Sequence, residues 1–310
     1  MTAAVTVVGE ALIDIVVPPT GPTAEHVGGS PANVAIGLAR LGHPTSLATH
    51  LGTDDRGTRI AAVLDAEHVT LAPGSLAAER TPTATARLDE AGAATYEFDL
   101  EWRLDPGLEV PTGAHLHTGS IAAVLSPGGA AVVTILETSR QRATISYDPN
   151  VRPSLMGKAE AAGATIEHLV SLADVVKASD EDLRWLYPDV EVEDVLRRWA
   201  ALGPRVVAVT RGGRNVTVLV GGEVHELPVH PVEVVDTVGA GDSFMAGLLS
   251  GLLDAGLLGD AAARARLVAA GWSEVFPAVV RAVECAAITV SRAGANPPTR
   301  EELGLEPAPR

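Results

Sequence analysis

The segment from Asp236 to Phe244 combines an anion-binding loop with a neighbouring acid. It reads Asp-Thr-Val-Gly-Ala-Gly-Asp-Ser-Phe, and the apolar residues that follow it predict a helix. Gly239 and Gly241 allow the backbone to approach a ligand, and a helix N-terminus offers unpaired N–H groups and a positive dipole end to a phosphate. Asp242 would lie beside that anion, where a carboxylate can accept the proton of a hydroxyl that attacks phosphorus. The local pattern is equally compatible with an ordinary acid in a first helical turn.

A second glycine-rich loop, at residues 28–33, enters another predicted helix. Ser30 suits the N-cap of that helix, and Pro31 suits its first turn. Gly28, Gly29 and Asn33 could then present backbone groups and an amide to a polar ligand. The alternative is a loop-to-helix connection without a ligand.

Two charged residues occupy positions where a ligand would explain them. Asp14 lies between Ile13 and Ile15 in an apolar stretch, and a buried charge needs a partner or a ligand unless the side chain faces outward. Arg152 belongs to a segment that follows a predicted strand, where α/β folds carry ligand-binding residues. Arg152 is therefore a candidate for binding a sugar hydroxyl or a phosphate, and the alternative is a polar turn between two prolines.

Two further polar segments follow predicted buried strands. In the segment 179–182, which opens a helix, Glu181 or Asp182 could hold Mg²⁺ through water, although acids in a first turn also complement the helix dipole. The segment Thr210-Arg211-Gly212-Gly213 could approach the phosphates of a nucleotide.

Strands and helices alternate along most of the chain, which predicts an α/β fold with a mainly parallel sheet covered by helices on both faces. Strands are expected at 4–9, 45–51, 114–118, 143–148, 174–178 and 205–210, a hairpin at 216–227, and helices at 30–41, 55–67, 128–140, 158–172, 179–187, 191–202 and over most of 240–293. Residues 18–29 are rich in turn formers. Alternating polar residues predict a hairpin over 80–98 that turns at 89–92, and with residues 11–27 it would form a small projecting sheet.

Composition excludes several classes of function. The chain has 310 residues, with 39 Asp and Glu against 23 Lys and Arg, for a net charge of -16. Such a surface repels polyanions, so we expect neither a nucleic-acid partner nor a membrane partner. The single cysteine, Cys285, excludes an internal disulfide framework. The sequence shows no signal-peptide pattern and no run of about 18 apolar residues, so we expect a cytoplasmic protein.

The two glycine-rich segments, in this order and at this separation, resemble the signatures of the ribokinase-like carbohydrate kinases of the PfkB type. The signatures correspond to residues 28–42 and 236–244, and similarity extends through 148–153 and the tail at 292–295. The resemblance implies a single kinase domain over residues 1–310. It also implies a three-layer αβα fold with a central, mostly parallel sheet and a small β-strand lid formed by about 11–27 and 80–120.

The resemblance also implies roles for individual residues. Asp242 would be the catalytic base, and the amides of Gly239, Ala240 and Gly241 would form the anion hole. The implied sugar contacts are Asp14, Gly28, Gly29, Asn33, Phe98 and Arg152; the implied ATP contacts are Thr210, Gly212 and Asn296; and the implied monovalent-cation site comprises Asp236, Val238, Thr289, Arg292 and Gly294. The family often has Asn-x-x-Glu where this chain has Ser-Asp-Glu-Asp, so Asp182 would contact Mg²⁺ through water in place of a glutamate.

The implied activity is phosphorylation of a primary hydroxyl of a small sugar by ATP with Mg²⁺, and with K⁺ as a further cation that the resemblance leaves open. The opening Gly-Glu-Ala-Leu-Ile-Asp at 9–14 and the segment 148–153 look most like those of fructokinases. Kinases of 2-keto-3-deoxygluconate, ribose or nucleosides share the scaffold, and so could a sensor without catalysis. The 3% aromatic content disfavours a nucleoside, because bases stack on rings. The protein would be a monomer or a homodimer through the lid.

Overall fold

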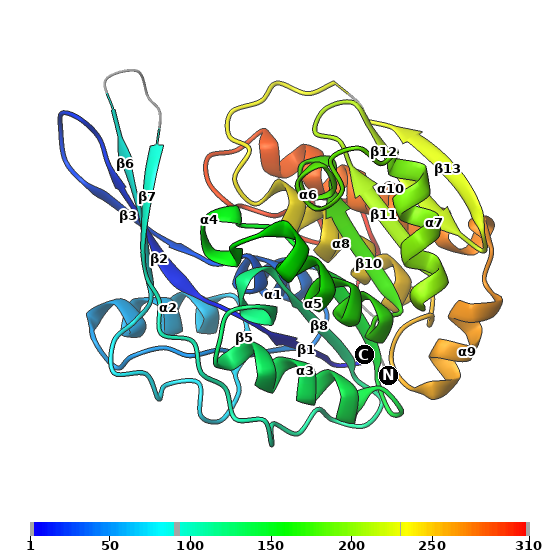
Figure 1. Cartoon of the computed structure of the whole chain (residues 1–310), viewed down its shortest axis with the longest axis horizontal. Helices are drawn as coiled ribbons and strands as arrows, with labels where there is room; N and C mark the ends of the chain where they lie inside the picture. Colours follow the sequence, from blue (N-terminus) through cyan, green and yellow to red (C-terminus); the bar gives the residue numbers. More distant parts are fainter. Residues whose placement is uncertain (1–2, 90–93, 230, 308–310) are drawn as a thin grey trace.

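The computed structural model describes residues 3–89, 94–229 and 231–307. Its centre is a nine-stranded sheet with the order β13-β12-β11-β10-β9-β8-β1-β4-β5 (Figure 1). The parallel strands are β1 (Val5–Val8), β4 (Thr45–Ala48), β5 (Val69–Leu71), β8 (His115–Gly119), β9 (Thr144–Asp148), β10 (Val175–Ser179) and β11 (Val206–Thr210). An antiparallel hairpin, β12 (Asn215–Val220) and β13 (Glu223–Pro228), completes one edge. These strands confirm the predicted mainly parallel sheet and its terminal hairpin.

Helices cover both faces of this sheet, and the core consists of two apolar clusters. One apolar cluster includes side chains of α1 (Ser30–Arg40), α2 (Asp55–Ala66), α8 (Ala240–Asp254), α9 (Ala261–Ala269) and α10 (Trp272–Val290). The other includes side chains of α3 (Gly128–Ser139), α5 (Ala159–Leu172), α6 (Asp180–Leu186) and α7 (Val192–Leu202). Short helices at Ser120–Ala123 (η1) and Pro153–Met156 (α4) follow β8 and β9. The result is the expected three-layer αβα arrangement. No helix of the described residues is both long and apolar enough to cross a membrane.

A four-stranded sheet projects from this body (Figure 1). Its order is β3-β2-β6-β7, from β2 (Leu12–Val17), β3 (Ala24–Gly28), β6 (Thr83–Leu88) and β7 (Ala94–Asp99). The strands β2 and β6 run parallel, and the other pairs are antiparallel. The predicted turn of the hairpin, at 89–92, lies almost entirely outside the described residues. The edge strands are β3 and β7, and pairing of two chains through this sheet stays a prediction.

One predicted bound of the projecting sheet was wrong. The range 80–120 is too long, because β8 lies in the central sheet between β1 and β9, where all five of its residues are buried. Within the turn-rich range 18–29, residues 24–28 form β3, which pairs with β2. Its exposed polar residues and nearby glycines conceal a strand, because a strand that lies at a sheet edge needs little apolar patterning.

Two buried histidines on β8 make the stability of the fold sensitive to acid. His115 contacts the hydroxyls of Thr144 and Ser146, each at 2.8 Å, and His117 Nδ1 lies 2.9 Å from Ser146 Oγ. Burial lowers the pKa of each imidazole to about 3. The unfolded chain therefore binds protons below pH 6.5 that the folded chain refuses, and stability is lost as the pH falls from that value toward 3.

We expect each of these histidines to remove about 1.4 kcal/mol of unfolding free energy per pH unit in this window. Urea denaturation at pH 7, 5 and 4 measures the slope. The variant His117→Gln should show a shallower slope, whereas His168→Gln, which changes an exposed histidine, should leave it unchanged. Equal slopes in the wild type and His117→Gln would contradict the prediction.

Candidate active site

The two glycine-rich loops meet at the N-termini of α1 and α8. Asp242, in the first turn of α8, is 8% exposed. Its Oδ1 accepts a hydrogen bond from Ser30 Oγ at 2.6 Å, and its Oδ2 accepts one from Asn33 Nδ2 at 2.8 Å. The structure therefore brings Asp242 and Asn33 together across 209 positions of sequence, and two donors fix the orientation of the carboxylate.

Ser30 was expected to be the N-cap of α1, and this expectation was wrong. The N-cap is Gly29, with φ of 106° and no side-chain capping bond, and Ser30 is the first helical residue. A side chain at Gly29 would also meet the carbonyl oxygen of Glu10 at 2.5 Å. The Ser30 hydroxyl thus donates to Asp242 and does not cap the helix. Ser30 therefore joins the candidate site, although its sequence position predicted only a structural role.

Asp14 lies on the projecting sheet and reaches the same place. A Cβ atom at Gly28 would lie 1.9 Å from Asp14 Oδ2, so the carboxylate rests directly on the Gly28 backbone. Burial raises the pKa of Asp14, the charges of Arg152 and His26 lower it, and the charge of Asp242 raises it. The charges of Arg152, His26 and Asp242 are therefore near enough to act on Asp14, and binding of a sugar hydroxyl by this carboxylate stays a prediction.

Phe98 shares the face of the projecting sheet that carries Asp14. In register, Asp14 pairs with His26 on one side and Ala84 on the other, and Ala84 pairs with Phe98. Directly paired residues point to the same face of a sheet. The ring of Phe98 also stacks on Tyr96, with centroids 6.0 Å apart. Phe98 thus remains a candidate sugar contact, and His26 joins it as a residue that sequence reasoning did not single out.

Arg152 follows β9 and acts on two carboxylates. Its Nη1 donates to Asn150 Oδ1 at 2.8 Å, and Asn150 has a φ of 36°, which is unusual for a residue other than glycine. The positive charge of Arg152 lowers the pKa of Asp14 and of Glu10, against burial, which raises both. Arg152 is therefore close to the predicted sugar contacts, as expected.

The loop before α8 has the backbone of an anion-binding site. Gly239 caps α8 with φ of 75°, and a Cβ atom there would lie 2.6 Å from that of Ala295. Asp236 accepts hydrogen bonds from the backbone N–H groups of Val238 at 3.0 Å and Gly294 at 2.9 Å, and these bonds lower its pKa. The loop is thereby tied to the C-terminal tail. The N–H group of Ala240 donates to the Thr237 carbonyl oxygen at 3.3 Å, whereas those of Gly241 and Asp242, in the first turn of α8, have no backbone acceptor among the described residues.

The residues of the predicted cation site lie around this loop. Thr289 is fully buried and donates to Ser243 Oγ at 2.7 Å, and Gly294 donates to Asp236. Arg292 pairs with Glu302 on the other side of the tail. Gly294 thus contacts this loop directly and Thr289 contacts the first turn of α8, while the binding of a cation by carbonyl groups there stays a prediction.

Asp182 is held by backbone groups on both of its oxygens. Its Oδ1 accepts from Val151 N and its Oδ2 from Ser179 N, each at 2.7 Å, and Ser179 completes a capping box at α6. Asp182 therefore ties the loop after β9 to the end of β10. A water-mediated contact with Mg²⁺ would use the remaining lone pairs of this carboxylate, and it stays a prediction.

The three residues predicted to contact ATP differ in how well their positions fit that role. Thr210 ends β11, and Gly212, with φ of 58°, has open space around its Cβ position. Asn296 instead turns toward the far end of α1, where its Oδ1 accepts from Arg40 at 2.6 Å. Asp242 is bonded to the opposite end of the same helix, so a contact between Asn296 and adenine stays a prediction that this geometry does not support.

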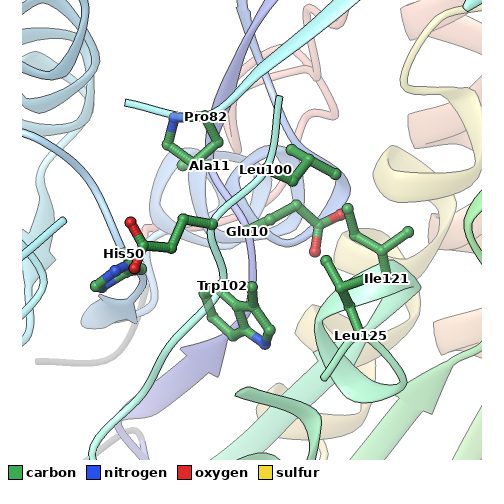
Figure 2. A pocket seen from close by; sticks show the side chains of 9 residues that line it. Glu10, Ala11, His50, Pro82, Leu100, Trp102, Ile121 and Leu125 are labelled. Carbon is green, nitrogen blue, oxygen red and sulfur yellow. The ribbon is translucent and has the colours of Figure 1, made fainter. Parts of the chain in front are cut away.

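Glu10 is a buried acid beside the site that sequence reasoning missed. It is 6% exposed, burial raises its pKa to about 7, and its Oε2 has no hydrogen-bond partner among the described residues. Figure 2 shows it in a pocket with His50, Trp102 and Ile121. The pocket holds only about 10 Å³, the space of one water molecule, so it cannot hold a sugar.

Lys177 is the second buried residue near the site that the sequence analysis did not single out as a candidate. Its Nζ lies 2.7 Å from Asp148 Oδ2, and both side chains are buried. A signal was present in the sequence, because Lys177 is one of only two lysines and interrupts an apolar strand.

A small sheet that carries Asp14, and a carboxylate beside a glycine-rich helix N-terminus, fit a phosphotransferase that acts on a hydroxyl group. The family described as pfkB family carbohydrate kinase matches residues 2–302. The chain belongs to this family and is a sugar kinase.

The relatives of the chain include several fructokinases. The chain is 32% identical to the fructokinase of Klebsiella pneumoniae over 304 residues, which cover 95% of each chain, and 31% identical to that of Escherichia coli over 99% of this chain and 100% of the relative. Among solved structures, the fructokinase of Vibrio cholerae O395 with fructose, ADP and a calcium ion superposes with a TM-score of 0.78 and 28% identity, over 95% of this chain and 94% of that one.

Proposed function

We propose that the protein is an ATP-dependent fructokinase that uses Asp242 as its catalytic base. The observation that carries this proposal is the placement of the Asp242 carboxylate. It lies in the first turn of α8, beside the N–H groups of the glycine loop, and Ser30 and Asn33 orient both of its oxygens. A base, an anion-binding loop and a second, half-buried acid, Asp14, are what transfer of a phosphoryl group to a sugar hydroxyl needs.

In the proposed reaction, each residue has a separate task. Asp14 and Asn33 bind hydroxyl groups of the sugar and direct its primary hydroxyl toward Asp242. As that oxygen bonds to the γ-phosphorus of ATP, the bond from phosphorus to the β,γ-bridging oxygen breaks, ADP leaves, and the hydroxyl proton passes to Asp242. The N–H groups of Gly239, Ala240 and Gly241 donate to the transferred group, where negative charge is concentrated.

Magnesium belongs with the nucleotide in this proposal. When bound, Mg²⁺ neutralises charge on the phosphate oxygens. Asp182 would hold it through water, because both carboxylate oxygens already accept N–H groups. For K⁺, the proposed site is made of Asp236, Val238, Thr289, Arg292 and Gly294.

The assignment to fructose rests on the relatives and on two segments of this chain. The Klebsiella and Escherichia relatives are named fructokinases, and the Vibrio enzyme holds fructose in its structure. The segment 9–14 contributes Asp14, and the segment 148–153 contributes Arg152, which lies close enough to act on the pKa of Asp14.

A screen of acceptors tests the proposal. ADP release should be measured with fructose, ribose, 2-keto-3-deoxygluconate, tagatose 6-phosphate and adenosine, each with and without K⁺. We expect fructose to give the highest kcat/KM and ATP alone to give almost none. A higher value for another acceptor would replace fructose, and thermal stabilisation by sugar and ATP without ADP release would indicate a sensor.

A further inference from the structure

Lys177 places a buried positive charge at the carboxyl edge of the central sheet. It belongs to β10 and is only 3% exposed. The only other lysine, Lys158, is exposed. Because a buried ammonium group is costly unless it is paired, the position of its Nζ requires an explanation.

One partner of the ammonium group is known. Its Nζ donates to Asp148 Oδ2 at 2.7 Å, and within the described part of the chain this is the only hydrogen bond that the group makes. An ammonium group has three N–H donors. Two of them therefore remain for another acceptor.

The ammonium group also lies against the glycine loop. A Cβ atom at Gly241 would lie 2.9 Å from Lys177 Nζ, so the amine reaches the first turn of α8 at the point where a side chain is missing. Ala240 and Gly241 open this helix, and Asp242 follows them directly. The amine thus lies beside the N–H groups that would bind the transferred phosphoryl group.

The carboxylates around Lys177 keep it charged. Burial alone would lower its pKa, but Asp148, Asp182 and Asp242 together raise it above its ordinary value. The group is therefore a fixed cation in a region that water hardly reaches, where its interaction with an anion is strong.

We propose that Lys177 is a further residue of the phosphoryl-transfer site, whose ammonium group extends the anion hole and contacts the γ-phosphoryl group of ATP while Asp148 holds it in place. This inference rests on the proposed function. Lys177 remains protonated throughout the transfer; it neither gives up nor takes the hydroxyl proton, which goes to Asp242. Its contribution is electrostatic, because its positive charge stabilises the negative charge of the transferred phosphoryl group.

The alternative is that Lys177 only neutralises Asp148, and three variants separate the two roles. Lys177→Met removes the charge, Asp148→Asn removes its partner, and the double variant removes both. Loss of one member of a buried pair destabilises a protein, whereas loss of both can be nearly neutral. Lys158→Met is the matched control for an exposed lysine.

We expect Lys177→Met to lower kcat with fructose by about 10²-fold, as loss of one anion-hole donor does. It should weaken binding of the β,γ-imido analogue of ATP while leaving the affinity for ADP unchanged. The double variant should regain resistance to urea but not kcat or affinity for the analogue. Asp148→Asn should still favour the analogue over ADP, and Lys158→Met should match the wild type.

Two results would overturn the inference: recovery of kcat in the double variant, or an equal loss of affinity for ADP and the analogue in Lys177→Met. If the wild type phosphorylates none of the acceptors, the proposed function fails. The comparison between ADP and its triphosphate analogue still decides whether Lys177 binds the γ-phosphoryl group.

Discussion

Replacement of Asp242 by asparagine is expected to lower kcat by about 10³-fold, within the range that general bases contribute. The amide has nearly the shape of the carboxylate but cannot accept the hydroxyl proton. It can still accept one hydrogen bond from Ser30 or Asn33, so we expect the free energy of unfolding to change by only about 1 kcal/mol. The coupled ADP-release assay measures kcat, and stabilisation of the variant by fructose measures binding.

Asp55→Asn is the matched control for this substitution. Asp55 is likewise an acid in the first turn of a helix, but it is exposed on α2 and has no assigned part in the site. Its variant should keep the wild-type kcat. A kcat for Asp242→Asn within tenfold of the wild type would show that another group takes the proton, and loss of stabilisation by fructose would assign Asp242 to binding instead.

The central fold and the core of the site could be predicted because their signals are local. Short apolar strands followed by amphipathic segments predicted the parallel sheet, and each glycine-rich loop marked a helix N-terminus. That the two loops meet follows from the topology, because α1 and α8 cover the same face of the sheet and both begin at its carboxyl edge. The local pattern marked each loop separately, and the resemblance to the PfkB-type kinases implied one site for Asp242 and Asn33, whose side chains the structure joins at 2.8 Å.

The remaining features depend on contacts that no local pattern contains. The strand β3 exists because β2 offers it an edge, not because its own residues are apolar. Ser30 has the residue type of an N-cap, but the backbone of Gly29 takes that position and leaves the hydroxyl to Asp242. The place of Asn296 is decided by Arg40, which comes from a distant helix.

The net charge illustrates the same limit. A value of -16 argues against polyanionic partners, but it is a property of the whole surface. Affinity for a phosphate is decided over a few ångströms, where the helix N-terminus of α8 and the ammonium group of Lys177 lie close together. An acidic protein can therefore hold a site that favours an anion.

The substitution Gly28→Ala is expected to raise KM for fructose by about 10²-fold, the effect of a displacement of about 1 Å in a site. The added Cβ atom would lie 1.9 Å from Asp14 Oδ2, so the carboxylate must move away from its place against the Gly28 backbone. The end of a side chain moves more easily than backbone, so the fold should persist and the affinity for ADP should stay unchanged. Gly163→Ala, in an open position of α5 with the nearest atom at 3.9 Å, is the matched control and should leave KM as it is. If Gly28→Ala kept the wild-type KM, the position of Asp14 would not determine sugar binding, whereas an equal loss of affinity for fructose and ADP would indicate damage to the whole site.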